Sequence, residues 1–430
     1  MQSIFQNDLK YPQASDIPIY SYDGAQMLLV PQTDKSQIDT YLAQLTQAGW
    51  AHFDTQRFGE NEAVTLLRDG AMLHVDADLG AGEVRIVHDP AAALYRTAPT
   101  AAEHPRQTML YQFETDHTLI DCGMCYILQC DDGSFFIIDS AHFYSFSDND
   151  RIHKFLRART PAGEKIVIAG WYFSHAHADH ICKFMDFLRY NCDDVELETL
   201  YFNFLPIDHP DSVHWSAGDQ RVKRNFAALL QEYPALPCVR IHTGQRFFVR
   251  NLEFRVLYTH EDAYPQSCAD YNTSSSVLLL NVDGSQVLFP GDASGIAADV
   301  LLQRYGDLLK SDILQIAHHG HFGLNEAFYE CVNARVALFP TTQIKYDEEY
   351  AVRAPNRLAA ALADYTYISA NGTVALSLPY GGGPAEFLGD ETFEDFKKIQ
   401  GLWGYAYTDE HKQELLDAFH ARGGKLVRTF

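Results

Sequence analysis

Four side chains of the kinds that bind transition metals lie within six residues of this chain, at His175, His177, Asp179 and His180. An apolar run at 165–169 precedes them and helical spacing of apolar residues follows them, which predicts a cluster at the junction of a strand and a helix. Side chains alternate along an extended segment, so the first two histidines share a side, whereas the aspartate and the last histidine lie at the turn into the helix. The spacing therefore predicts two adjacent metal sites.

A polar loop with chance histidines is the alternative explanation of this cluster. The chain has 19 histidines among its 430 residues, so one close pair would be unremarkable. Three histidines and an aspartate directly after a predicted strand are much rarer, and we favour the metal site. Neutral imidazole and carboxylate suit zinc, with manganese and iron as alternatives.

Strands that end in polar clusters recur through residues 105–380. Two pairs of apolar runs are joined by the hairpin signals Asp131-Asp132-Gly133 and Asp283-Gly284. A further predicted strand at 312–316 ends next to His318-His319-Gly320. Strands followed by alternating strands and helices predict two layers of sheet covered by helices.

Two other regions flank this central one. Residues 1–104 are expected to form a small α+β module, with a helix at 34–49, three short strands between 62 and 87, and a linker at 91–104. Residues 381–430 begin with three glycines and continue with helical spacing, which predicts a helical C-terminal extension. We therefore expect a central domain with an added module at each end.

The motif His-x-His-x-Asp-His between a strand and a helix resembles the signature of the metallo-β-lactamase superfamily. Three further segments resemble parts of that family: 124–139 its opening hairpin, 288–292 the strand that delivers a bridging aspartate, and 312–320 the segment that delivers the last histidine. With Asn272-x-x-Ser275 added, the pattern is most similar to the hydrolase domain of competence proteins of the ComEC type. The resemblance covers the central region only.

This resemblance implies a four-layer αββα sandwich that holds two metals at one edge, between its sheets. The implied ligands are His175 and His177 for one metal, Asp179 and His180 for the other, Asp292 as the bridge, and His318 or His319 to complete the second site. His319 precedes a glycine as in one branch of the superfamily, and His318 directly follows the strand and an alanine as in another, so both stay candidates. Asp139, at the end of the opening hairpin, is expected to orient a ligand rather than to bind metal.

The chain departs from the family pattern at one ligand. The third-motif histidine is not obvious, and its place falls on Asn272. His260 is the nearest histidine and is either a ligand that reaches the site or a surface loop residue. The resemblance therefore implies fewer protein ligands, and weaker binding, for the first metal.

The resemblance implies a metal-dependent hydrolase that uses two divalent metal ions, zinc first among them, and metal-bound hydroxide. Asp179 is the expected catalytic residue, because a carboxylate there can orient the nucleophile and carry a proton to the leaving group. The competence-type pattern favours a phosphodiester or another small ester. The alternatives are a di-iron oxidoreductase on the same fold, whose second motif position is glutamate where this chain has His177, and a non-catalytic metal-binding sensor module.

The composition of the chain limits the kinds of substrate and partner that we expect. The net charge of −24 repels polyanions, so we expect a small-molecule substrate and no nucleic acid. No run approaches the 18 apolar residues of a membrane-spanning helix, and the first 20 residues lack an apolar run of signal-peptide length, so we expect a cytoplasmic protein that does not bind membranes. The eight scattered cysteines are then expected to be reduced thiols.

Several further residues have two explanations. Cys122 and Cys125 have the spacing of a zinc or redox pair, but no second pair exists, and core packing is favoured. His142 and His321 lie near motif residues and are either substrate contacts or hydrogen-bonded loop residues.

The ligand cluster generates a first prediction. Protein purified without chelator should contain about two transition-metal ions per chain, measured by elemental analysis. Absence of metal, together with no uptake when zinc or manganese is added, would contradict the metal-site interpretation.

Overall fold

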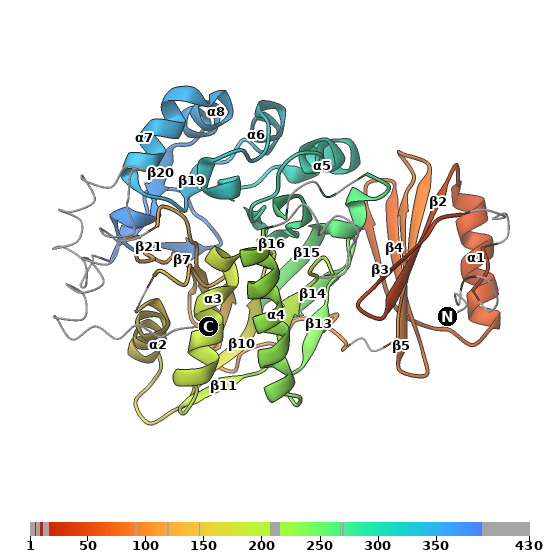
Figure 1. The fold of residues 1–430 in the computed structure, drawn as a ribbon, viewed down its shortest axis with the longest axis horizontal. Coiled ribbons are helices and arrows are strands. Elements are labelled where there is room, and N and C mark those ends of the chain that lie inside the picture. The colour runs from red at the N-terminus through yellow and green to blue at the C-terminus, as the bar shows by residue number, and fades with distance from the viewer. Residues whose placement is uncertain are drawn as a thin grey trace.

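The computed structural model describes residues 5, 9–11, 17–90, 93–117, 120–145, 147–206, 216–266, 268 and 271–388. Within them, three sheets are formed, of six, nine and seven strands. Figure 1 shows the six-stranded sheet at one end of the molecule and the two larger sheets, which face each other, in the rest of it.

The six-stranded sheet is antiparallel and is covered on one face by helix α1 (Lys35–Gln47). Its order is β1-β2-β6-β5-β4-β3, with β1 (Ile19–Tyr22), β2 (Ala25–Pro31), β3 (Ala51–Phe58), β4 (Asn61–Arg68), β5 (Ala71–Asp78) and β6 (Glu83–Asp89). Asp34 caps α1 by accepting a hydrogen bond from the backbone N–H of Gln37. Ile38, Tyr41 and Leu45 share one helix face and are buried against the sheet. The predicted helix and three strands, β4 to β6, are present, whereas β1, β2 and β3 were not predicted. Most residues of β3 are polar or exposed.

The nine-stranded sheet carries the histidine cluster at the end of one of its inner strands. Its order is β13-β12-β10-β9-β8-β7-β21-β22, with β11 beside β10. The strands are β7 (Thr108–Gln112), β8 (Tyr126–Gln129), β9 (Phe135–Ile138), β10 (Ile166–Tyr172), β11 (Val195–Leu197), β12 (Leu200–Phe202), β13 (Cys238–Arg240), β21 (Val374–Leu378) and β22 (Glu386–Phe387). β8 and β9 form the predicted antiparallel hairpin, and β10 runs parallel to β9.

The seven-stranded sheet has the order β14-β15-β16-β17-β18-β19-β20. Its strands are β14 (Arg246–Val249), β15 (Leu252–Tyr258), β16 (Val277–Val282), β17 (Ser285–Phe289), β18 (Ile313–Gln315), β19 (Val336–Phe339) and β20 (Tyr365–Ile368). β16 and β17 form the second predicted hairpin, and β17 to β20 are parallel. The carboxyl ends of β17 and β18 therefore meet at one edge of the sheet.

The two large sheets pack face to face and are each covered by helices on the outside. Phe136 of one sheet and Phe254 of the other stack with ring centroids 4.3 Å apart within the apolar cluster between the sheets. The helices are α2 (Asp148–Arg159), α3 (Ala178–Tyr190) and α4 (Ala217–Glu232) on the nine-stranded sheet, and α5 (Ala297–Tyr305), α6 (Glu326–Val332), α7 (Gln343–Val352) and α8 (Ala354–Leu362) on the seven-stranded sheet. This arrangement confirms the predicted four-layer αββα sandwich.

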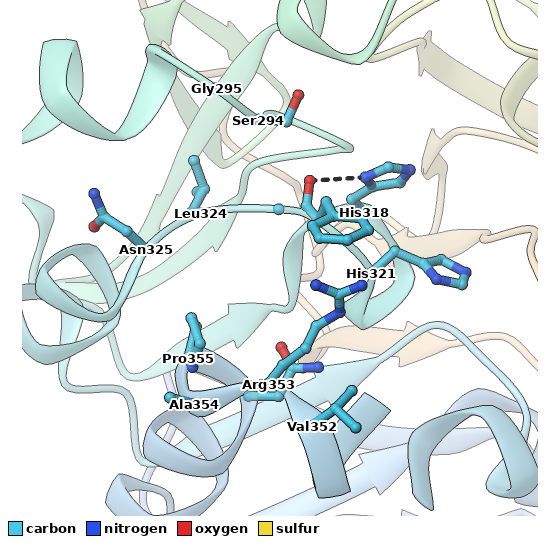
Figure 2. A pocket seen from close by; sticks show the side chains of 13 residues that line it. Ser294, Gly295, His318, His321, Leu324, Asn325, Val352, Arg353, Ala354 and Pro355 are labelled. Carbon is cyan, nitrogen blue, oxygen red and sulfur yellow. Dashed lines mark hydrogen bonds between the residues drawn. The ribbon is translucent and has the colours of Figure 1, made fainter. Parts of the chain in front are cut away.

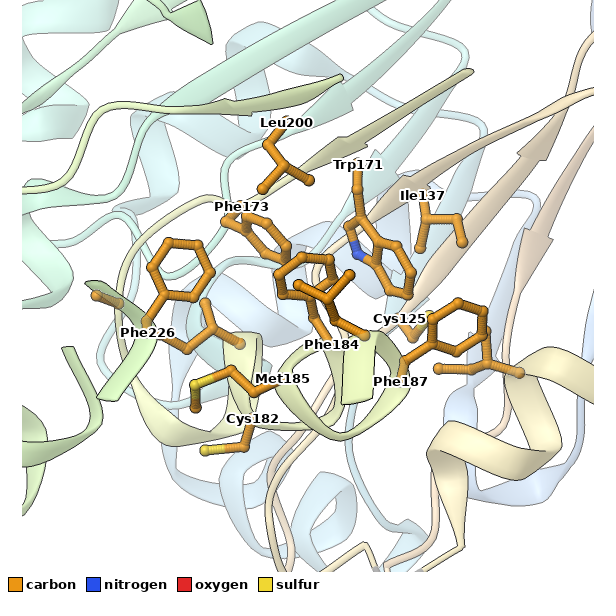
Figure 3. Close-up of a cluster of buried hydrophobic side chains, with 14 of the residues drawn as sticks. Cys125, Ile137, Trp171, Phe173, Cys182, Phe184, Met185, Phe187, Leu200 and Phe226 are labelled. Atoms are coloured by element: carbon orange, nitrogen blue, oxygen red, sulfur yellow. The ribbon is translucent and has the colours of Figure 1, made fainter. Parts of the chain in front are cut away.

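Helix α3 is held to its sheet by aromatic packing (Figure 3). The ring of Phe184 lies 4.9 Å from that of Trp171 and 4.8 Å from that of Phe173, and all three side chains are fully buried. The first turn of α3 contains Asp179 and His180. The apolar contacts of the helix therefore fix the position of two predicted ligands.

The six-stranded sheet rests on the sandwich through buried polar contacts. Arg304, in the last turn of α5, pairs with Asp76 of β5 and, at 3.2 Å, with Asp262 of the segment after β15. Tyr22 of β1 donates a hydrogen bond to Glu261. Because charges buried in this way are costly unless they stay paired, the contact holds the sheet in one position.

The C-terminal region differs in part from the prediction. Residues 381–388 contain strand β22, which pairs with β21, rather than a helix. Glycines and a proline at 381–384 favour a turn that returns the chain to the sheet edge. The helical extension predicted over 389–430 lies outside the described residues. None of the helices in the described ranges has the length and apolar character needed to cross a bilayer.

The packing of α3 generates the second prediction. Phe184→Ala should lower the free energy of unfolding by about 3–5 kcal/mol, because it leaves a cavity among rings that cannot collapse. Tyr190→Ala on the same helix is the control, since Tyr190 is 57% exposed and its loss should change stability by less than about 0.5 kcal/mol. Urea denaturation of both variants measures the difference. Equal stabilities would show that α3 is not anchored at Phe184.

Candidate metal centre

Three loops at one edge of the sandwich bring the predicted ligands together. The chain leaves β10 at Tyr172, and His177 is the N-cap residue of α3. Asp292 follows β17, and His319 follows β18 in a 3-10 turn (Ala317–Gly320). The site therefore forms where strands from both sheets end, as expected for a ligand site in an open α/β arrangement.

One group consists of Asp179, His180, Asp292 and His319, whose ligand atoms all lie within 4.8 Å of one another. Nε2 of His180 lies 3.1 Å from Oδ2 of Asp292, and Nε2 of His319 lies 3.3 Å from the same oxygen. The His319 Nε2 is also 3.0 Å from Oδ2 of Asp179. Two imidazoles and two carboxylates thus surround one point, which is a donor set suited to a divalent transition metal.

A second group consists of His175, His177 and Asp292. Nε2 of His175 lies 2.9 Å from Nδ1 of His177 and 3.9 Å from Oδ2 of Asp292. Asp292 therefore belongs to both groups. This is the placement that a carboxylate bridging two ions requires.

Side chains behind the ligands fix the orientation of the imidazole rings. Nδ1 of His180 hydrogen-bonds Oδ2 of Asp139 at 2.9 Å, and the backbone N–H of Ser174 donates to the other oxygen of Asp139. Nδ1 of His319 donates to the carbonyl oxygen of Pro340 at 2.8 Å. In both rings the outer nitrogen is occupied, so Nε2 faces the centre. Asp139 thus lies where the sequence analysis expected it, behind a ligand.

The backbone at the centre adopts conformations that few residues tolerate. His318 and His319 have φ values of 52° and 55°, in the left-handed region that is unfavourable for non-glycine residues. Gly291 has a φ of 57°, and a Cβ atom there would lie 2.7 Å from Cβ of Ser174. Such strain persists only where the surroundings impose it, and it commonly marks functional sites.

Unsatisfied buried atoms test whether the residues fit a metal. Nε2 of His180, Nε2 of His319 and Oδ1 of Asp292 are buried and form no hydrogen bond of acceptable geometry with any described residue. Buried polar atoms without partners are rare because each costs about 1–3 kcal/mol. Nε2 of His180 and Nε2 of His319 lie within 3.3 Å of Oδ2 of Asp292, so a cation held between these groups would satisfy both nitrogens. The residues fit a bound metal.

The charges at the centre are strongly coupled. Burial opposes ionisation of each ligand, but the carboxylates of Asp292 and Asp179 raise the pKa of His180 well above its usual value and that of His319 to about 10. Burial likewise opposes ionisation of the two aspartates, yet the histidines hold the pKa of each carboxyl well below its usual range. A divalent cation would compete with protons for the same lone pairs.

Of the two adjacent histidines, only His319 faces the centre. His318 is absent from both ligand groups formed by described residues. Its Nδ1 donates to the carbonyl oxygen of Phe322, and its Nε2 accepts from Nδ2 of Asn272 at 3.2 Å. The structure thus separates the two candidates that the sequence left open.

His260 is not brought to the centre either. Its Nε2 lies 3.0 Å from Oδ1 of Asn203, and its ring packs edge-on against Tyr22 of the N-terminal sheet. It is fully buried rather than a surface loop residue. Asn272, which occupies the third-motif place, has a buried Oδ1 with no partner among the described residues and lies beside His318.

Two residues near the centre were not singled out by the sequence. Asp219, in the first turn of α4, has Oδ1 3.9 Å from Nε2 of His177, and Tyr271 stacks on the His177 ring at 5.3 Å. No motif marks these two residues, because each comes from a segment distant in sequence from the histidine cluster. Of the two cysteines expected in the core, Cys125 lies in the apolar core as predicted, whereas Cys122 is half-buried and hydrogen-bonds Asp179.

No protein-family model matches this chain, and no curated protein does. Similar solved structures include the metallo-β-lactamase fold protein YhfI from Bacillus subtilis, with 11% identity over 60% of this chain and 96% of that one and a TM-score of 0.35. A putative zinc-dependent hydrolase of the metallo-β-lactamase superfamily from Thermotoga maritima has 13% identity over 54% of this chain and 74% of that one, with a TM-score of 0.25. The di-iron β-hydroxylase CmlA from Streptomyces venezuelae has 13% identity over 64% of this chain and 55% of that one, with a TM-score of 0.37. Identities and TM-scores this low carry no argument about the activity of this chain.

The two adjacent histidines generate the third prediction. His319→Ala should lose about one of two bound metal ions, because it removes a nitrogen that faces both aspartates, whereas His318→Ala should keep both ions. Metal content of each variant, measured after dialysis, tests this, with circular dichroism to show that both fold. Loss of metal from His318→Ala alone would reverse the assignment.

Proposed function

We propose that this protein is a metal-dependent hydrolase with two divalent metal ions, zinc first among the candidates. One ion would be held by His175 and His177, and the other by Asp179, His180 and His319. Asp292 would contribute to both sites. The observation that supports this most directly is that two ligand groups share the buried carboxylate of Asp292.

Two ions bound by these residues would supply a water of pKa about 7 and would stabilise negative charge on a phosphoryl or carbonyl oxygen. The chain itself supplies the positioning. Asp179 is the more accessible of the two carboxylates, with 14% of its side chain exposed against 2% for Asp292. We assign to it the orientation of the attacking water and the transfer of a proton to the leaving alcohol.

The substrate we propose is a small phosphodiester. Water adds to phosphorus, the bond from phosphorus to the leaving oxygen breaks, and the alcohol leaves with a proton. The competence-type pattern of Asn272, Asp292 and His319 supports a phosphate ester, and the net charge of −24 argues against polymeric nucleic acid. We also propose that the protein acts in the cytoplasm and not at a membrane.

Hydrolysis of chromogenic substrates is the fourth prediction. Zinc-loaded or manganese-loaded protein should hydrolyse bis(4-nitrophenyl) phosphate, lose the activity with chelator and regain it with metal. Asp292→Ala should lower the rate by about 100-fold or more, because both ions lose a ligand. Asp299→Ala is the matched control, since Asp299 is exposed on the helix that follows the same loop, and its rate should be unchanged.

A parallel panel of phosphomonoester, lactone, thioester and β-lactam substrates identifies the ester class. Turnover of one of these in place of the diester would contradict the phosphodiester assignment and leave the hydrolase intact. Iron-dependent oxygen uptake without hydrolysis would identify the di-iron oxidoreductase alternative. A fully metallated protein inert in every assay would identify a metal-binding sensor.

A further inference from the structure

A cavity of about 570 Å³ adjoins the metal centre, between the loop after β18 and the junction of α7 and α8. His318, which precedes the ligand His319, and Ser294, two residues after Asp292, both line it. The rings of His318 and His321 lie 6.4 and 6.5 Å from the ring of His319, so the cavity borders the ligand group that contains His319. Figure 2 shows Arg353 extending from the α7–α8 junction toward His318 and His321.

The lining of this cavity carries no carboxylate, although the chain as a whole has a net charge of −24. Its one charged side chain is the cation Arg353. Behind the lining, Glu349 accepts from Nε of Arg353 and lies 2.8 Å from Nζ of Lys345. The exposed carboxylate of Glu348 lies 4.0 Å from Nζ of Lys345. Arg353 is thus held by a carboxylate that it shares with a second cation.

The guanidinium of Arg353 is positioned to bind a ligand through its outer edge. Its carbon lies 3.5 Å from the centre of the Phe322 ring, which is a cation–π contact. Nε is used by Glu349, while the two terminal nitrogens donate to no described residue. A guanidinium held in this way with a free outer edge matches the two oxygens of a carboxylate or phosphate.

We propose that this cavity binds a second anionic group of the substrate, a carboxylate or a phosphate, while the scissile ester lies at the metals. The inference rests on the proposed function and specifies its substrate as an ester that carries an acidic arm. Arg353 is the residue that determines this specificity. Phe322 and Val352, which are 75% and 73% exposed, form an apolar rim past which the arm enters.

The fifth prediction compares four 4-nitrophenyl phosphodiesters whose second arm is methyl, 2-methoxyethyl, 2-carboxyethyl or 2-phosphoethyl. The wild type should favour the two acidic arms over methoxyethyl by about tenfold in kcat/KM, mainly through KM, as expected for one charged hydrogen-bonded contact. Arg353→Gln should remove this preference, and Arg353→Lys should restore part of it. Arg357→Gln, on an exposed arginine of α8 outside the cavity, is the control and should keep it.

A second variant avoids any disturbance of the Glu349 pair. Val352→Glu places a carboxylate at the exposed rim and should repel the acidic arms, whereas Val352→Gln should not. A preference for phosphoethyl alone identifies a phosphate site, and equal preference identifies a general anion site. Absence of any preference in the wild type, or a preference that survives in both Arg353→Gln and Val352→Glu, would overturn the proposal.

A binding measurement without turnover tests the anion site independently of the hydrolase proposal. On zinc-loaded protein, 3-phosphonopropionate should bind about tenfold more tightly than propylphosphonate by calorimetry, and Arg353→Gln should abolish the difference. This result, obtained with no turnover of any diester, would support the anion site and refute the hydrolase. Equal binding of the two phosphonates beside normal turnover would refute the anion site alone.

Discussion

The arrangement of the centre depends on the contacts between the Asp292 carboxylate and the histidines around it. This carboxylate is almost fully buried, and it faces nitrogens of His175 and His180, from the segment after β10, and of His319, from the turn after β18 in the other sheet. A carboxylate buried so deeply is stable only beside positive charge or hydrogen-bond donors. The loops must therefore meet at this point, which ties the ends of β10, β17 and β18 to one another.

The scaffold makes that meeting possible. Aromatic packing under α3 holds Asp179 and His180, Gly291 lets the chain pass close to Ser174, and the left-handed backbone at His319 turns its ring inward. The energetic cost of this backbone is met by the packing around it. The same apolar contacts that stabilise the sandwich thus maintain a strained and highly charged edge.

The sequence predicted most of the fold and the members of both ligand groups, because these features are local. The hairpins at 131–133 and 283–284 and the cluster at 175–180 are short patterns with direct physical meaning. The choice between His318 and His319 could not be made, since it depends on two consecutive left-handed residues that no local pattern encodes. Strands β1, β2 and β3 were missed; most residues of β3 are polar or exposed, so its place in the sheet depends on pairing with β4 rather than on a local pattern. Asp219, Tyr271 and Arg353 could not be assigned because only the tertiary fold brings them near the histidines.

The position of His260, away from the metal centre, affects how this protein can be shortened. The segment that would supply a further histidine ligand instead packs against the N-terminal sheet, through His260 and Glu261 with Tyr22 and through Asp262 with Arg85 at 3.9 Å. In addition, Asp76 of that sheet pairs with the buried Arg304 of α5. Removing residues 17–90 would take these partners away from buried charged groups, so a shortened chain should keep the N-terminal sheet.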